Sequence, residues 1–67
     1  MTKFAERLKE LRIDNHLSQQ QLAKELNVSQ AAIARWEAKL QIPNIDILMV
    51  VALYFKVSAG YLLGLEN

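Results

Sequence analysis

The 67-residue chain has no cysteine, one proline and two glycines. The lack of cysteine excludes disulfides, a thiolate zinc site and a thiol nucleophile, so a hydrophobic core must hold the fold together. Hydrophobic residues make up 52% of the chain, which is enough for such a core, although a domain of this size buries only about 60% of its unfolded surface. The length leaves room for one domain, and we expect residues 1–67 to form it.

Strong charge of one sign and long apolar runs are also missing. Eight Lys and Arg residues against seven Asp and Glu residues give a net charge of +1, which alone identifies no class of partner. The longest apolar run covers residues 47–55, whereas a membrane-spanning helix needs about 20 residues. The residues before this run do not have the pattern of a secretory signal peptide, in which a charged segment is followed by an apolar one. We therefore expect a soluble, cytoplasmic protein without a membrane partner.

The scarcity of turn residues and the absence of alternating apolar and polar positions predict an all-α fold, a compact bundle of five helices. Apolar residues at positions 4, 8 and 11 predict the first helix over residues 2–15. Good capping residues predict where the other helices begin: Ser18, Ser29, Asn44 and Ser58. These helices are expected over residues 19–27, 30–38, 45–56 and 59–63.

Two helix boundaries carry more specific signals. Ser18 and Gln21 match the capping box, in which the serine hydroxyl accepts from the amide three residues on and the glutamine reaches back. Asn27 is expected in the left-handed conformation that ends the second helix, and Gly64 in the same conformation after the last helix.

The fourth expected helix is apolar on two faces. The face assigned to the core carries Ile45, Leu48, Val51, Ala52 and Phe55. The opposite arc carries Ile47, Val50, Leu53 and Tyr54, and a small soluble domain rarely leaves such a patch in water. We expect leucines of the last helix, Leu62, Leu63 and Leu65, to cover part of it. A second copy would cover the rest, in a homodimer interface that includes Val50, Leu53, Tyr54 and Leu65.

Residues 19–38 fit a helix-turn-helix, because two short helices are joined by a tight turn. Ala23 is small where the next helix must cross, and Ile33 and Trp36 are spaced to anchor that next helix. The opposite face of the helix over residues 30–38 is free and carries Gln30, Ala31, Ala34, Arg35 and Ala38. Ser29 lies at its N-terminus, where free amides favour a phosphate.

Three segments, FAERLKELR, LSQQQLAKELNVSQAAIARWE and LYFKVSAGYLLG, resemble the Cro and phage-repressor family of helix-turn-helix regulators, the XRE-like family. The motifs LSQ, LA, VS, IxxWE, a following proline and VSxxYLLG occur in the family's order and spacing. The resemblance implies a lambda-repressor-like DNA-binding domain. It also implies a transcriptional regulator, expected to be a repressor of prophage or plasmid type, that acts as a homodimer on a double-stranded DNA operator without a cofactor.

The resemblance also implies roles for individual residues. Gln30, Ala31 and Arg35 would approach base edges, and Arg12 and Glu37 would form a structural ion pair. Phosphates would be contacted by Gln19, Ser29 and Lys39. The family usually has glycine where this chain has Asn27 and Lys39. At Lys39 the chain must therefore either adopt a positive φ or take another path.

Two other functions compete with DNA binding. The helix-turn-helix scaffold could serve as a protein-interaction module, as in an antitoxin or a co-regulator. Catalysis is disfavoured, because Asp14, His16 and Ser18 lie in one local stretch that cannot hold them in Ser-His-Asp geometry. His16 also has no second histidine and no cysteine for a metal site, so neither an enzyme nor a metal is expected.

Overall fold

This computed structural model describes residues 2–67, and these residues contain five α-helices. In order they are α1 (Phe4–Asp14), α2 (Gln19–Leu26), α3 (Gln30–Glu37), α4 (Ile45–Phe55) and α5 (Ala59–Leu63). This part of the chain contains no strand, so the predicted all-α fold is confirmed. None of these helices is long and apolar enough to cross a membrane, as judged over the same residues.

Four helices begin at the predicted capping side chains. Ser18 accepts from the amide of Gln21 at 3.0 Å, and the Gln21 side chain accepts from the Ser18 amide at 2.8 Å, which completes the capping box. Ser29, Asn44 and Ser58 cap α3, α4 and α5 by accepting from the amide three residues on, without the reciprocal bond of a capping box. The predicted start of α1 at residue 2 is wrong, because Thr2 and Lys3 precede the helix and Lys3 provides no side-chain cap.

All five helices end in the same manner. A residue with positive φ follows the helix, and the amide of the next residue, which is always apolar, bonds a carbonyl five positions back, as in a Schellman motif. The residues with positive φ are His16, Asn27, Lys39, Lys56 and Gly64. The left-handed conformations of Asn27 and Gly64 were predicted, whereas those of His16 and Lys56 were not. Lys39 has φ 65°, which decides between the two alternatives at that position.

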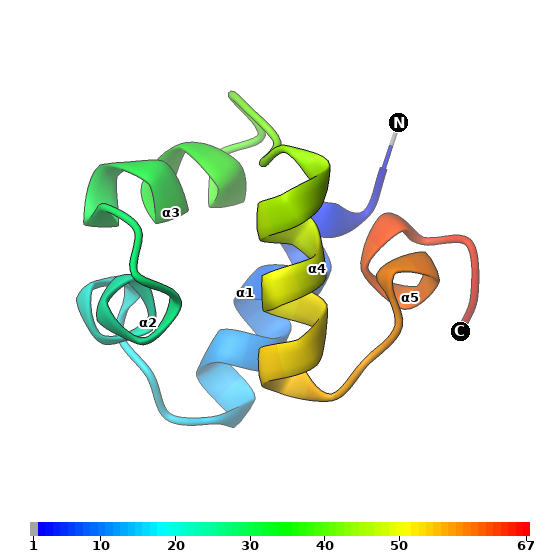
Figure 1. Ribbon diagram of the computed structural model, residues 1–67, viewed down its shortest axis with the longest axis horizontal. Helices are drawn as coiled ribbons and strands as arrows, with labels where there is room; N and C mark the ends of the chain where they lie inside the picture. Colours follow the sequence, from blue (N-terminus) through cyan, green and yellow to red (C-terminus); the bar gives the residue numbers. More distant parts are fainter. Residues whose placement is uncertain (1) are drawn as a thin grey trace.

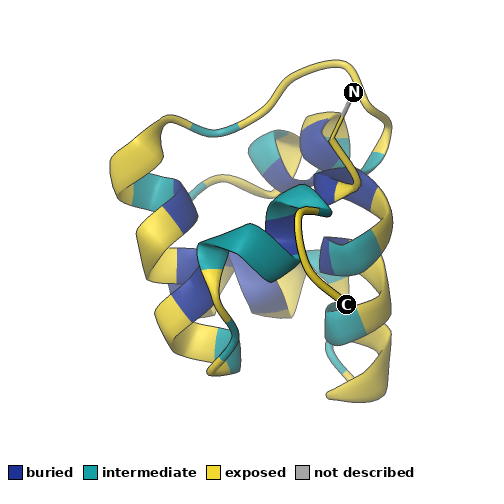
Figure 2. Cartoon of the chain, turned by 90° about the vertical axis from the view of Figure 1, so that its right-hand side faces the viewer, coloured by how far each residue is buried: buried dark blue, intermediate teal, exposed yellow. Residues whose placement is uncertain are grey.

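α1 and α4 lie in the middle of the view, with α2 and α3 on one side and α5 on the other (Figure 1). The largest fully buried side chains come from all five helices: Phe4, Leu8, Leu22, Ile33, Val51 and Leu62. Buried residues line the inner sides of the helices, and exposed residues lie outside (Figure 2). Trp36 of α3 packs edge-on against Phe4 of α1, with ring centroids 6.1 Å apart. The core therefore fixes α3 directly onto α1.

The orientation of α4 differs in part from the sequence prediction. Leu48, Val51 and Ala52 are buried as expected, but Ile45 is 72% exposed. Ile47, expected on the outer arc, packs partly buried against the core. The outer face of α4 therefore carries five exposed apolar residues: Ile45, Met49, Val50, Leu53 and Tyr54.

The last helix does not cover this face as expected. Leu62 is fully buried in the core, Leu63 packs partly buried against the core, and Leu65 lies beyond the end of α5 with its side chain exposed. A helix with apolar residues all round does not determine its own rotation, because either side can face the core.

Candidate functional site

The predicted helix-turn-helix is formed by α2, a three-residue turn and α3. Asn27 ends α2 with φ 59° and ψ 43°, and Ser29 then caps α3. α2 and α3 pack closely against each other, and Ala23 of α2 is buried. A larger side chain at position 23 would displace α3, because packed interiors leave little spare volume.

The exposed face of α3, defined here as Gln30, Ala31 and Arg35 together with Ala38 just after the helix, points away from the core. Ile33 and Trp36 anchor the opposite side of the helix in the core. The three residues predicted to approach bases, Gln30, Ala31 and Arg35, thus lie on one exposed helix face, and a short helix presented in this way fits the width of a DNA major groove.

The N-terminus of α3 offers hydrogen-bond donors to an anion. The Ser29 hydroxyl accepts from the amide of Ala32 at 3.0 Å, which leaves its own proton available for donation. The first amides of any α-helix have no partner within the helix, and the helix dipole adds positive potential there. Ser29 is exposed, so a phosphate can reach these groups.

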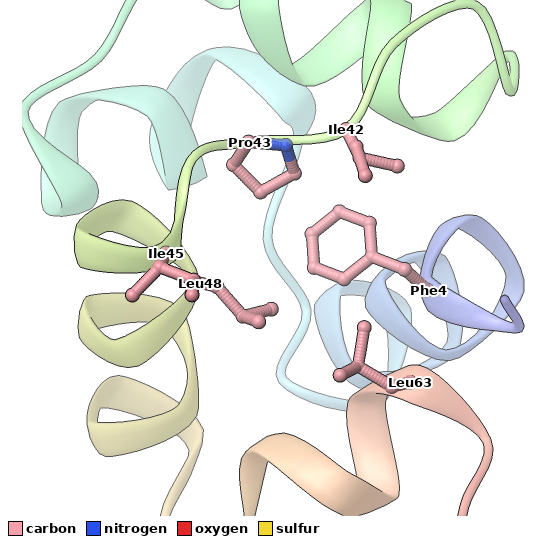
Figure 3. Close-up of a pocket in the computed structure, with 6 residues that line it drawn as sticks. All are labelled: Phe4, Ile42, Pro43, Ile45, Leu48 and Leu63. Carbon is pink, nitrogen blue, oxygen red and sulfur yellow. The ribbon is translucent and has the colours of Figure 1, made fainter.

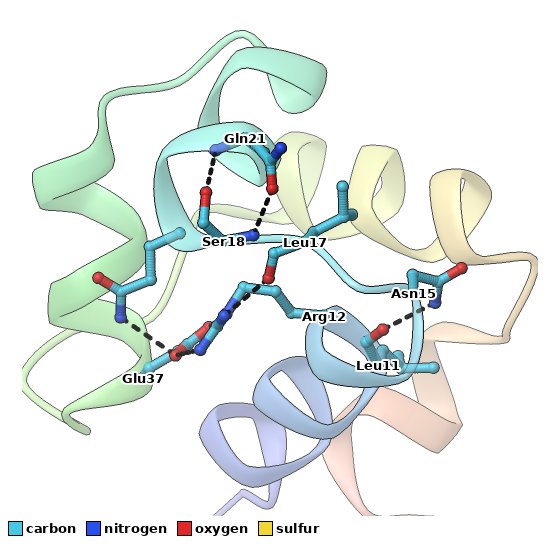
Figure 4. A network of polar contacts seen from close by, with 8 residues as sticks. Leu11, Arg12, Asn15, Leu17, Ser18, Gln21 and Glu37 are labelled. Carbon is cyan, nitrogen blue, oxygen red and sulfur yellow. Dashed lines mark hydrogen bonds and ion pairs between the residues drawn. The ribbon is translucent and has the colours of Figure 1, made fainter.

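Arg12 and Glu37 lie within ion-pair distance. Arg12 Nε is 2.7 Å from Glu37 Oε2, and Arg12 Nη2 donates to Glu37 Oε1 at 3.0 Å (Figure 4). Only 12% of the Arg12 side chain and 4% of the Glu37 side chain are exposed. Arg12 Nη1 also donates to the carbonyl oxygen of Leu17 at 2.8 Å. The arginine therefore joins α1, the connection before α2 and the last turn of α3.

The pKa of Arg12 is raised above its ordinary value. The hydrogen bond to Glu37 is the main cause, and the attraction of that carboxylate adds to it, while partial burial opposes both. The Arg12 guanidinium is therefore charged at physiological pH.

Two of the predicted phosphate-contacting residues also bind carboxylates of their own chain. Gln19 Nε2 donates to Glu37 Oε1 at 3.2 Å, so its amide is part of the Arg12–Glu37 network. Lys39 Nζ is 3.5 Å from Glu6 Oε1, and both of these side chains are more than half exposed. An exposed pair of this kind is weak, so a phosphate can replace Glu6 as the partner of Lys39.

Gln41 is a polar neighbour of α3 that the sequence reasoning missed. Arg35 Nε donates to Gln41 Oε1 at 2.9 Å. Gln41 follows the left-handed Lys39, and the amide of Leu40 bonds the Arg35 carbonyl at 2.9 Å, which folds the chain back over the last turn of α3. No motif marked this residue, because the contact depends on the path of the connection after α3.

A pocket of about 220 Å³ lies between the start of α1, the connection before α4, and helices α4 and α5. Its lining is entirely apolar: Phe4, Ile42, Pro43, Ile45, Leu48 and Leu63 (Figure 3). The lining therefore offers no group for acid–base or nucleophilic chemistry. Within residues 2–67, no three His, Asp or Glu side chains gather as they would around a metal ion.

Comparison with protein families identifies residues 8–62 as a helix-turn-helix. Among curated proteins, the chain is 39% identical over 64 residues to the HTH-type transcriptional activator BcrR of Enterococcus faecalis. It is 32% identical over 64 residues to the uncharacterized HTH-type transcriptional regulator YobD of Bacillus subtilis. Each alignment covers 96% of this chain but only 31% of BcrR and 57% of YobD.

Solved structures share the fold. The SinR protein, solved in complex with SinI, gives a TM-score of 0.81 at 30% identity, over 90% of this chain and 59% of that one. An HTH_3 family transcriptional regulator from Vibrio cholerae gives a TM-score of 0.80 at 26% identity. The match covers 97% of this chain and 36% of that one. The SOS-response transcriptional repressor LexA from Eubacterium rectale gives a TM-score of 0.86 at 24% identity. The match covers 91% of this chain and 65% of that one, and this likeness concerns the fold alone.

Proposed function

Because the chain belongs to the helix-turn-helix family, we propose that it regulates transcription by binding a double-stranded DNA operator with the exposed face of α3 in the major groove. The observation that carries the proposal is the orientation of α3. Its apolar side is anchored in the core through Ile33 and Trp36, while Gln30 and Arg35 are exposed on the other side. The similar proteins that are named as transcriptional regulators support the same function.

The exposed face of α3 offers three kinds of base contact. The Arg35 guanidinium suits the O6 and N7 acceptors of guanine, and the Gln30 amide suits the N6 and N7 atoms of adenine. Ala31 can contact only a thymine methyl group. Direct hydrogen-bond readout in this domain is therefore assigned mainly to Gln30 and Arg35.

Phosphate contacts are assigned to Ser29, Gln19 and Lys39. Ser29 and the first amides of α3 lie at the positive end of the helix dipole. Gln19 keeps its second amide hydrogen for a phosphate while it donates the first to Glu37. A net charge of +1 implies that each subunit neutralises few phosphates, so binding should weaken only modestly as salt is raised.

We propose a homodimer as the form that binds the operator. The domain measures 27 × 23 × 20 Å, whereas successive major grooves on one side of the duplex lie about 34 Å apart, so one copy cannot occupy two of them. The outer face of α4 supplies exposed apolar residues for pairing, among them Val50, Leu53 and Tyr54. Leu65, also exposed, is assigned to the same interface.

Repression in the cytoplasm is the regulatory outcome that we propose. A dimer seated on its operator excludes other proteins from that stretch of duplex, so repression requires nothing beyond binding itself. No catalytic step is involved.

A selection from random duplex DNA tests this function. The wild-type protein should enrich a two-fold symmetric motif, and Arg35→Ala should lose the preference at one position in each half-site. An absence of any motif with the wild-type protein would reject DNA reading. The exposed apolar face of α4 and the adjoining pocket favour a protein-interaction module as the second candidate, and the same result would support it.

A further inference from the structure

We propose that Gln41 positions Arg35 for base recognition and thereby sets the specificity of the exposed face of α3. The inference rests on the proposed function. Gln41 accepts a hydrogen bond from Arg35 Nε at 2.9 Å, although the two residues are six positions apart and belong to different elements.

The backbone after α3 determines this contact. Lys39 has φ 65°, and the Leu40 amide bonds the Arg35 carbonyl at 2.9 Å, so the chain reverses over the last turn of the helix. This reversal brings position 41 back beside position 35. The contact is thus tied to the helix end itself, where Ala38 and Lys39 donate to carbonyls of the last turn of α3.

Engaging Nε leaves a particular part of the guanidinium for DNA. Arginine carries one N–H on Nε and two on each Nη. With Nε bonded to Gln41, the remaining edge runs across Nη1 and Nη2, which forms a fork that matches guanine O6 and N7 end-on. A freely rotating Arg35 could equally approach a phosphate. Gln41 therefore favours base reading over non-specific contact by holding the guanidinium before DNA arrives.

Gln41→Leu tests the proposal, because leucine is similar in size but cannot accept a hydrogen bond. We expect discrimination for guanine at the Arg35-dependent position to fall about threefold to tenfold, which corresponds to the cost of immobilising one long side chain. The thermal midpoint of unfolding should not change, and affinity for unrelated duplex DNA should not fall, because a released Arg35 can still contact a phosphate. Gln41→Glu keeps an acceptor oxygen, so it should retain the discrimination, while its negative charge lowers affinity for all sequences.

Two further measurements separate positioning from other roles. If Gln41 acts through Arg35, adding Gln41→Leu to Arg35→Ala should have no further effect on base preference. In the free protein, NMR should show slow solvent exchange of the Arg35 Nε hydrogen, and Gln41→Leu should accelerate that exchange.

The possible failures are distinct. Unchanged guanine discrimination in Gln41→Leu, alongside a loss in Arg35→Ala, would overturn the positioning role and leave DNA reading intact. A persistent effect of Gln41→Leu in the Arg35→Ala background would also overturn it, since Gln41 would then read a base itself. A wild-type protein without any base preference would overturn both proposals.

Discussion

Arg12 and Glu37, 25 positions apart, are joined by two parallel hydrogen bonds that fix α1 to the last turn of α3. α3 carries the proposed base-reading face, and it has only eight residues. A helix this short has little stability of its own and depends on tertiary contacts. The Arg12–Glu37 pair therefore helps to set the orientation of the exposed face of α3 relative to the rest of the domain.

Glu37→Ala should destabilise the domain by about 3 kcal/mol, because it leaves the Arg12 guanidinium largely buried without its partner. Urea unfolding followed by fluorescence of the buried Trp36 measures the loss. Glu6→Ala is the control, since it removes the exposed pair with Lys39 and should cost less than about 1 kcal/mol. Equal losses in the two variants would contradict a structural role for the Arg12–Glu37 pair.

The conformation of Lys56 leads to a second prediction, in which one kind of substitution has opposite effects at two sites. Lys56 ends α4 with φ 59°, a region that is costly for residues with a Cβ atom. Lys56→Gly should therefore stabilise the domain by about 0.5–1 kcal/mol, after the greater flexibility of glycine in the unfolded chain is subtracted. Lys9→Gly, on the exposed side of α1, should destabilise it by about 0.7 kcal/mol. Thermal unfolding of both variants checks the two signs, and a destabilised Lys56→Gly would contradict the prediction.

The starts of α2, α3, α4 and α5 could be predicted because their causes are local. A serine or asparagine accepts from an amide three residues on, and the capping box of Ser18 and Gln21 lies within one turn. The ends were harder to predict, because lysine and histidine give no sign that they will adopt positive φ. At His16 and Lys56 a residue other than glycine adopts the left-handed conformation, and the amide of the following apolar residue donates to a carbonyl five positions back.

Contacts between different helices and connections could not be predicted from the residue pattern alone. The apolar pattern of α4 cannot say whether Ile45 or Ile47 faces the core, because both helix faces are apolar; packing against the other helices decides it. Gln41 has no local signature either, since it meets Arg35 only after the chain reverses. The Arg12–Glu37 pair was predicted from the family resemblance, not from helix periodicity.

The outer face of α4 leads to a third prediction. Leu53 and Leu40 are both 76% exposed, but only Leu53 lies on the proposed dimer interface. Leu53→Lys should make the protein monomeric in sedimentation at tens of micromolar, because it places a charge in an apolar contact. Leu40→Lys should leave the dimer intact. A wild-type protein that is monomeric at this concentration would argue against the interface.

Tyr54 offers an independent signal for that interface. The pKa of its phenol is already raised within one copy, first by partial desolvation and then by the carboxylate of Glu25. Further desolvation in a dimer raises the pKa of this phenol again. Ionisation of Tyr54, followed by ultraviolet absorbance, should therefore need a higher pH in the wild-type dimer than in Leu53→Lys. The same ionisation pH in both would show that Tyr54 lies outside the interface.

The N-termini of α3 and α5 allow a matched test of phosphate contact. Ser29 and Ser58 cap their helices identically, accepting from the amide three residues on at 3.0 and 2.9 Å. Aspartate caps a helix as well as serine does, so Ser29→Asp and Ser58→Asp should both fold with unchanged stability. Only Ser29→Asp would place a negative charge against the DNA backbone. It should weaken binding on the order of tenfold for every sequence, since one close like-charge contact costs about 1 kcal/mol or more.

The pattern across sequences distinguishes this effect from loss of a base contact. Ser29→Asp should lower the affinity for the selected motif and for unrelated duplex DNA by the same factor, because phosphates carry no sequence information. Raising the salt concentration should reduce that factor, since the added repulsion is screened. Arg35→Ala should instead lower the affinity for the selected motif alone. If Ser58→Asp weakens binding as much as Ser29→Asp does, the duplex is not held at the N-terminus of α3, and the proposed docking of that helix in the major groove is wrong.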